Sequence, residues 1–264
     1  MGKALQVVTG FVTAPSTTLT AWTMASGDTL AIRNTQEGPM IQLVTMWADN
    51  QAAGALTIRS PLLHDNVVGM RAGIVASEVY PLFPLGMGQK LRPQDLLIAE
   101  QSGSAVAGDI ETGAMLIYYQ DLPGADARLV TWDQISGRIE SYMFVTNTLS
   151  LGTAGGYSGE EAINAEMDQW KANRDYALVG YLTTVECAVI GWRGPDTSNL
   201  RIAGPGNETN KNLTFDWFAM LSKLTGLPTI GVFNAANKGA TLIDGVQDEN
   251  GADPLVTSIF ALLK

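Results

Sequence analysis

The chain has 264 residues, of which 46% are hydrophobic and only 16% are charged, and its formal net charge is −10. An acidic chain lacks the excess of Lys and Arg that contact with nucleic-acid phosphates requires, so we expect no direct nucleic-acid binding. The length suits two domains better than one, and the sparse charge favours a surface that partly faces other subunits.

The first half of the chain predicts an all-β unit. Runs rich in Val, Ile, Thr and aromatic residues alternate with Gly, Pro, Asn and Asp at a spacing of roughly 8–15 residues, which is typical of a β-sandwich or barrel. The predicted strands are 5–12, 19–24, 29–34, 40–48, 55–59, 67–71, 95–100 and 114–120. Eight strands are the number found in a jelly roll.

A boundary between two domains is predicted at Leu122–Asp126, where a Pro-Gly pair ends the last of these strands. We therefore expect an N-terminal jelly roll over 1–124 and a C-terminal jelly roll over 125–264. The predicted strands of the second half are 128–132, 139–145, 148–151, 176–185, 187–192, 199–202, 229–233, 241–246 and 255–263.

Two short helices are predicted in the second half. Ser158–Glu161 has the sequence of a capping box, and Ile163, Met167 and Trp170 follow at helical spacing, which predicts a helix over 158–173. A second helix is predicted over 215–225, because Phe215, Phe218, Leu221 and Leu224 share one face and Gly226 follows. Each would pack against the flank of a barrel.

The two halves also carry similar segments. Thr23–Ala31 resembles Met143–Ser150, and Ile58–Pro61 resembles Trp192–Pro195. The two segments of the second pair lie 15 residues further apart in the chain than the two segments of the first pair. We assign this difference to a helical insertion near 158–173. A repeated β unit indicates a protein that builds surfaces more than a catalyst.

The residues that catalysis or metal binding would need are scarce. His64 is the only histidine, which nearly excludes a cupin-like metal site, and no Gly-x-Ser-x-Gly segment accompanies it for a serine triad. Cys187 is the only cysteine and lies in an apolar run, so we interpret it as a packing residue. We expect no enzymatic activity and assign no catalytic, cofactor-binding or metal-binding residues.

One acidic cluster leaves an ion site open as an alternative. Asp244, Asp248, Glu249, Asn250 and Asp253 offer oxygen atoms that calcium accepts, but their spacing is not that of an EF-hand loop. We interpret the cluster as a solvated hairpin and keep calcium binding as the alternative.

The duplicated pattern resembles the double jelly-roll major capsid proteins of icosahedral, often membrane-containing, DNA bacteriophages. The segments that carry the resemblance are Ser26–Leu30 and Asn147–Leu149, the turns Arg59–Pro61 and Arg193–Pro195, and the flank helix at 215–225. The resemblance implies an all-β fold of two tandem eight-stranded jelly rolls.

The resemblance also implies a function. Three copies would form a pseudo-hexameric trimer that contacts neighbouring capsomers and other virion proteins in an icosahedral shell. The protein would be made in the host cytoplasm and end in the virion, with room for an internal membrane beneath the shell. No apolar stretch reaches about 18 residues, so the chain itself is expected to be soluble and without a membrane span.

Two other functions stay open at this point. A carbohydrate-binding or carbohydrate-cleaving double β-sandwich is the alternative, in which Glu140 or Glu186 would belong to a catalytic carboxylate pair. The six tryptophans argue against it, because they lie in strand and helix patterns that predict core positions instead of a sugar-stacking platform. A spike or tail component of a virion is the third possibility.

Overall fold

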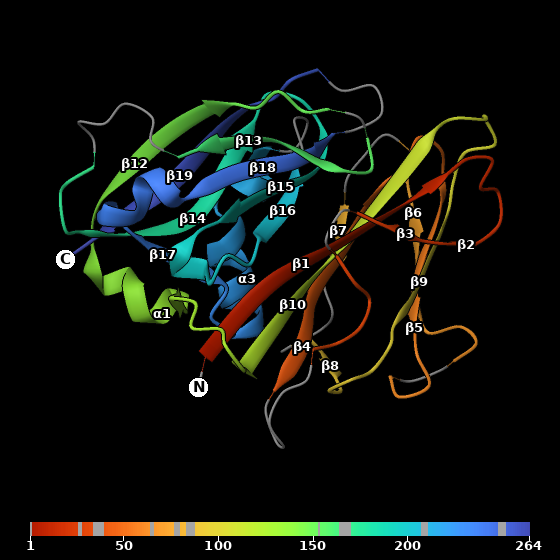
Figure 1. The fold of residues 1–264 in the computed structure, drawn as a ribbon, viewed down its shortest axis with the longest axis horizontal. Helices are drawn as coiled ribbons and strands as arrows, with labels where there is room; N and C mark the ends of the chain where they lie inside the picture. Colours follow the sequence, from red (N-terminus) through yellow and green to blue (C-terminus); the bar gives the residue numbers. More distant parts are fainter. Residues whose placement is uncertain are drawn as a thin grey trace.

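The structure is a computed structural model that describes residues 2–25, 28–33, 40–63, 66–76, 80–82, 88–152, 154–163, 170–206, 211–247 and 252–264. Most of the described chain is β-strand, arranged in four antiparallel sheets that form two sandwiches. In Figure 1 the first sandwich lies on the right and the second on the left.

The first sandwich contains the strands of the N-terminal half. They are β1 Gly2–Thr13, β2 Thr20–Ala21, β3 Thr23–Met24, β4 Ile41–Asp49, β5 Gly54–Arg59, β6 Met70–Ile74, β7 Tyr80–Leu82, β8 Gln89–Leu91, β9 Ile98–Ser102 and β10 Ile110–Leu122. One sheet has the order β3-β1-β10-β4-β7, with β8 also paired to β4, and we call it the inner sheet of the first sandwich. The other has the order β2-β9-β5-β6 and is its outer sheet.

The second sandwich repeats this plan. Its strands are β11 Leu129–Val130, β12 Ile139–Thr148, β13 Tyr157–Ala162, β14 Asp175–Thr183, β15 Cys187–Arg193, β16 Ile202–Gly206, β17 Ile230–Asn234, β18 Leu242–Gln247 and β19 Leu255–Leu263. The inner sheet of the second sandwich has the order β13-β18-β15-β16, and its outer sheet has the order β11-β17-β14-β19-β12.

The strand order of each sandwich is that of a jelly roll. When the eight principal strands of either half are counted along the chain, one sheet has the order 1-8-3-6 and the other has the order 2-7-4-5. Strands β3 and β11 are additions at sheet edges, and β7 and β8 share the sixth position. The predicted fold of two tandem jelly rolls is therefore confirmed.

The four sheets form a stack of layers (Figure 1). Alternate residues of β1 point to opposite faces of the sheet, and they enter two different cores. Ala4 and Val8 pack in the core of the first sandwich, whereas Leu5 and Val7 pack against the second. The inner sheet of the first sandwich is therefore buried on both faces, which explains why β4 is buried along its whole length.

One of the two sequence repeats is structurally equivalent in the two sandwiches. Arg59 ends β5 and Arg193 ends β15, 134 positions later in the chain. Glu100 lies opposite the residue two before Arg59, and Asp244 lies opposite the residue two before Arg193. Each arginine forms an ion pair with that acid.

The other repeat is not structurally equivalent. Thr23–Met24 forms β3, which pairs along the edge of β1, whereas Met143–Thr148 lies within β12, the counterpart of β1. The spacing of this repeat therefore gives no support to the inference of an inserted helix. The second half is instead lengthened between β16 and β17, where helices α2 and α3 lie.

The prediction of a helix over 158–173 is wrong for residues 158–162. Tyr157–Ala162 forms β13, which pairs with β18, so sheet hydrogen bonding prevails over the local capping pattern. The Ser158 hydroxyl accepts a hydrogen bond from the Gly152 N–H instead of capping a helix. Residues 164–169 lie outside the described residues.

The helix predicted over 215–225 is confirmed. The helical segments are α1 Trp132–Ile135, η1 Ser136–Arg138, η3 Pro195–Thr197, α2 Lys211–Phe215, α3 Trp217–Thr225 and η4 Ala235–Ala240. Helix α3 ends at Gly226, which adopts the left-handed conformation with φ of 71°. Its buried side chains include Trp217, Phe218 and Leu221, while Leu224 is exposed.

Among the predicted strands, three differ most from the structure. Of residues 148–151 only Thr148 lies in a strand, as the last residue of β12. The described residues 29–33 contribute a single bridge at Ala31, and the strand predicted over 199–202 begins only at Ile202, as β16. Among the described residues, every strand pairs within its own half of the chain. The division into domains at 1–124 and 125–264 stays a prediction.

Trp192 is expected to be a main contributor to the stability of the second sandwich. Its side chain is fully buried, and its indole N–H donates to the Ser258 hydroxyl over 2.9 Å. Replacement by alanine leaves a large cavity, so Trp192→Ala is expected to lower the free energy of unfolding by about 3–5 kcal/mol. Urea denaturation measures this loss. The exposed control Val106→Ala is expected to change it by less than about 0.5 kcal/mol, and equal stabilities of the two variants would contradict the prediction.

Candidate interaction surfaces

An apolar joint connects the two sandwiches. Trp47 of β4 is fully buried there, and its indole N–H donates to the Ala188 carbonyl of β15 over 2.7 Å. Its ring meets that of Trp217 edge to face, with 6.1 Å between centroids. The backbone N–H of Val7 donates to the Arg201 carbonyl over 2.9 Å, so main-chain bonding also crosses the joint.

A polar cluster lies at one end of this joint. The Arg201 guanidinium donates to both carboxylate oxygens of Asp244, at 2.8 and 2.6 Å, and lies 3.7 Å from the centroid of the Tyr157 ring. The Tyr157 hydroxyl is 2.6 Å from the Thr9 hydroxyl of the first sandwich. Asp28, also from the first sandwich, accepts the Thr9 N–H over 2.7 Å.

Asp28 is a carboxyl group whose charge this cluster only partly compensates. Burial raises its pKa to about 6, and the negative charge of Asp244 acts in the same direction. The Thr9 N–H and the positive charges of Arg201 and Arg33 oppose this effect without cancelling it. Both oxygens of Asp244 already bind Arg201, so that arginine compensates the charge of Asp244 first.

An apolar groove lies on the exposed face of the outer sheet of the second sandwich. It has a volume of about 350 Å³. Its lining residues are Trp132, Tyr142, Phe144, Val179, Phe215, Asp216, Ala219 and Ile259. Tyr142, Phe144 and Phe215 are about half exposed, at 52%, 48% and 47%, whereas Val179 and Ile259 form the buried floor. These aromatic side chains come from β12, α1 and α2, so no local sequence pattern predicts the cluster.

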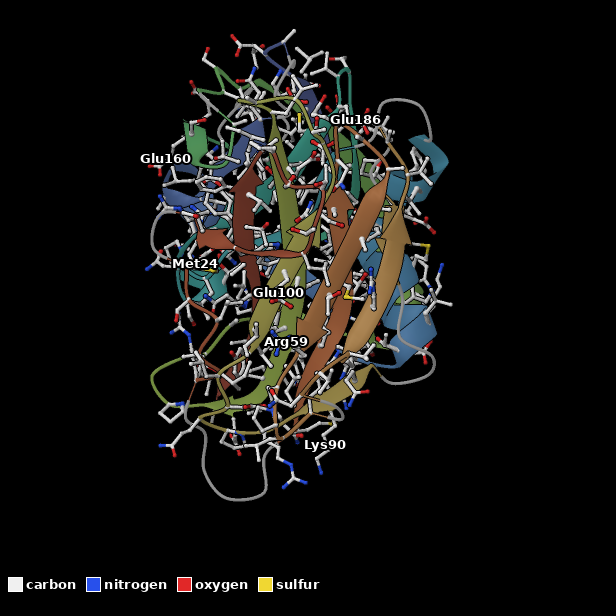
Figure 2. All side chains as sticks on the ribbon, turned by 90° about the vertical axis from the view of Figure 1, so that its right-hand side faces the viewer. Met24, Arg59, Lys90, Glu100, Glu160 and Glu186 are labelled. Atoms are coloured by element: carbon white, nitrogen blue, oxygen red, sulfur yellow. The ribbon has the colours of Figure 1, made fainter. Side chains whose placement is uncertain are left out.

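The exposed face of the outer sheet of the first sandwich is different in character. Arg59 at the end of β5 and Glu100 of β9, the two central strands of the sheet, form a two-bond ion pair with both distances at 3.0 Å (Figure 2). Arg71 and Glu100 both lie opposite Thr57, so these side chains share one face. This surface carries charged side chains of both signs.

The structure separates the two carboxylates considered for glycoside cleavage. Glu140 is at the start of β12, near the end of the sheet that holds Leu263, whereas Glu186 follows the opposite end of β14. The nine residues of β14 span roughly 25 Å, far more than the separation of a catalytic pair. Hydrogen bonds from Lys171 and Arg174 also hold the pKa of Glu140 below its usual range, opposite to what a general acid needs.

The remaining candidate residues have simple surroundings. Cys187 is fully buried, which confirms its interpretation as a packing residue. His64, Asp248, Glu249 and Asn250 lie outside the described residues. Asp244 is bound to Arg201 and so is not available to calcium, and Asp253 is exposed. In the described ranges, no group of three or more His, Cys, Asp or Glu side chains is placed to hold a metal ion.

Five of the six tryptophans are buried, as the sequence predicted. Trp22, Trp47, Trp170, Trp192 and Trp217 are each at most 7% exposed. Trp132 is the exception, because it lines the groove with the Lys223 ammonium 4.3 Å from its ring centroid.

None of the helices in the described part of the chain is long and apolar enough to cross a membrane.

Comparison with known proteins gives only weak likenesses. No family model and no curated protein matches the chain. Among solved structures, it is similar to the PBSX exported protein XepA, with 11% identity, a TM-score of 0.26, and coverage of 97% of this chain and 86% of that one. The major capsid protein P2 from bacteriophage PM2 has 7% identity and a TM-score of 0.25, with coverage of 99% and 98%.

A cupin 2 conserved barrel domain protein from Leptotrichia buccalis has 8% identity and a TM-score of 0.18, with coverage of 100% of this chain and 92% of that one. All three TM-scores lie below 0.5, so these likenesses carry no argument about function. The chain is an all-β protein of two tandem sandwiches, and its class rests on its own strand order.

Asp28 gives the joint a specific dependence on pH. A carboxyl whose pKa is higher in the folded than in the unfolded state binds its proton more tightly when folded, so this group adds stability as the pH falls through about 6 toward 4. Asp28→Asn keeps an acceptor for the Thr9 N–H and removes the charge. We expect it to raise the free energy of unfolding by about 1 kcal/mol at pH 8 and to change it little at pH 4.

Thermal and urea unfolding across this pH range measures the difference between variant and parent. The exposed Asp253→Asn is the matched control and is expected to follow the parent. A difference between Asp28→Asn and the parent that does not vary with pH would show that the charge of Asp28 has no such role.

Proposed function

We propose that this protein is the structural subunit of an icosahedral virion shell, in which it assembles as a pseudo-hexameric homotrimer. The observation that carries the proposal is the way in which the two jelly rolls pack within one chain. The 1-8-3-6 sheet of the first sandwich faces the 2-7-4-5 sheet of the second. The joint is therefore head to tail, not a contact between two identical faces.

A head-to-tail joint leaves one face of each kind open. The chain presents the 2-7-4-5 sheet of its first sandwich at one end of the stack and the 1-8-3-6 sheet of its second at the other. Contacts of this heterologous kind form rings when the rotation between units closes. Three chains supply six similar sandwiches, which is the number needed for a six-sided tile.

Other features fit a shell protein better than a catalyst. The apolar core extends through the joint, so the two sandwiches form a single building block. The net charge of −10 is compatible with a shell that does not hold the genome directly. An internal membrane between the shell and the genome would separate them in this way. We propose no enzymatic activity, a location in the virion after synthesis in the host cytoplasm, and neighbouring capsomers as further partners.

One observation favours the alternative of a carbohydrate-binding protein. The groove with Trp132, Tyr142 and Phe144 offers aromatic rings on which a sugar could stack. Sugar recognition also needs several polar groups to bind the ring hydroxyls, and Asp216 is the only charged residue of the lining. The mostly apolar lining fits a protein surface better.

The mass of the purified chain in solution tests the proposal directly. Size-exclusion chromatography with light scattering is expected to give three times the chain mass of 28.1 kDa, and negative-stain images are expected to show six-sided particles. A monomer at all accessible concentrations would count against a shell protein. A glycan array provides the comparison, since clear binding that Trp132→Ala abolishes would favour the alternative.

A further inference from the structure

The two sandwiches share a row of equivalent residues across their 1-8-3-6 sheets. In the first, Val7 of β1 lies opposite Leu116 of β10, and Val44 is the extra residue of a β-bulge in β4 beside it. We call these three residues the Val7 row. The row is fully covered by the second sandwich, with no member more than 1% exposed.

The second sandwich contains the same arrangement in its outer sheet. Phe144 of β12 lies opposite Ile259 of β19, and Val179 is the extra residue of a bulge in β14 beside it. We call these three residues the Phe144 row. A bulge at the same place of the third strand makes the correspondence firm, because bulges are specific features of a sheet. The two rows differ in how far they are covered, because Phe144 is 48% exposed and the Phe144 row lines the groove.

The surfaces that face these rows also correspond. The Val7 row packs on the inner sheet of the second sandwich, whose ion pair of Arg193 and Asp244 lies near the joint. The equivalent pair in the first sandwich is Arg59 and Glu100, on the exposed face of its outer sheet (Figure 2). Asp244 is only 3% exposed, whereas Glu100 is 18% exposed and Arg59 is 22% exposed. We call the surface formed by Arg59, Glu100 and Arg71, which lies over the buried Thr57, the Arg59 face.

Each chain thus carries two corresponding pairs of surfaces. The Val7 row and the inner sheet of the second sandwich cover one another, whereas the Phe144 row and the Arg59 face are both open. We infer that the Phe144 row of one copy docks on the Arg59 face of a second copy, as the Val7 row docks on the second sandwich within one chain. This inference rests on the proposed function, because it supplies the contact through which the trimer would form. The partner is a second copy of this chain because the Arg59 face is the counterpart of the surface that covers the Val7 row within one chain.

The side chains of the two surfaces suit one another. Tyr142 and Phe144 present two aromatic rings with little rotamer freedom, the kind of side chain that dominates protein interfaces. The two hydrogen bonds to Glu100 fix the orientation of the planar Arg59 guanidinium, which is partly exposed. An aromatic ring can therefore stack on its face without breaking the ion pair. The same chain already shows this contact, where Arg201 bonds to Asp244 while lying over Tyr157.

Cross-linking between engineered cysteines tests the contact. The native thiol of Cys187 is buried, so new surface cysteines are the main sites of reaction. The double variant Phe144→Cys with Arg71→Cys keeps the Arg59–Glu100 pair. A short bismaleimide is expected to convert it into a covalent three-chain species, whereas each single variant gives no such product. The control is Phe144→Cys with Val106→Cys, since Val106 is exposed in the turn before β10 and outside the Arg59 face.

A charge placed in the row gives an independent readout. Phe144→Asp is expected to weaken association at least tenfold in sedimentation equilibrium, while Val106→Asp assembles like the parent. Because Phe144 is half exposed, the variant is expected to stay folded, which its melting temperature checks.

The outcomes separate the two proposals. A trimer that gives no product from the Phe144→Cys, Arg71→Cys variant, or that tolerates Phe144→Asp, overturns the docking mode and leaves the shell function standing. A parent chain that stays monomeric overturns both. A covalent trimer from the double variant, absent from the control, supports both.

Discussion

The whole architecture depends on one sheet that is buried on both of its faces. Alternate side chains of β1, β4 and β10 serve the core of the first sandwich and the joint to the second. Each fully buried Val or Leu contributes roughly 1.5–3 kcal/mol, so the joint is comparable to a domain core and not to a loose contact between domains. The order of the four layers follows, because this sheet can satisfy both faces only if the second sandwich stays packed on it.

The polar cluster at the end of the joint gives this apolar contact a direction. Apolar faces slide against one another at little cost, whereas the Thr9 hydroxyl meets Tyr157 and the Val7 N–H meets the Arg201 carbonyl at one alignment only. Asp28 adds a carboxylate to a site where Arg201 already compensates Asp244. The cluster thus fixes the alignment of the two sandwiches and stores a mild electrostatic strain when Asp28 is ionised.

The sequence predicted the fold well where side-chain pattern and burial agree. Strands β4 and β19 were visible as runs of apolar and β-branched residues, and the Arg-x-Pro turns after β5 and β15 marked a true repeat. The segment after Ser158 misled because its capping pattern is local, while β13 is fixed by pairing with β18, far away in the chain. The same reason hid the groove, since Trp132, Phe144 and Phe215 become neighbours only through sheet pairing and the position of α2.

The two equivalent rows differ in size at one position, where Val7 corresponds to Phe144, and the short connection after Leu122 bears on this difference. The first and second sandwiches are tethered by the few residues between β10 and β11, so their association loses almost no translational freedom and behaves as if each partner were present at a very high concentration. The internal joint, which already contains Trp47, therefore does not depend on a large side chain at the position of Val7. A contact between separate molecules must overcome the full entropic cost of association, which requires larger anchors. In the proposed docking of separate copies, Phe144 and Tyr142, which correspond to Val7 and Leu5, would supply such anchors.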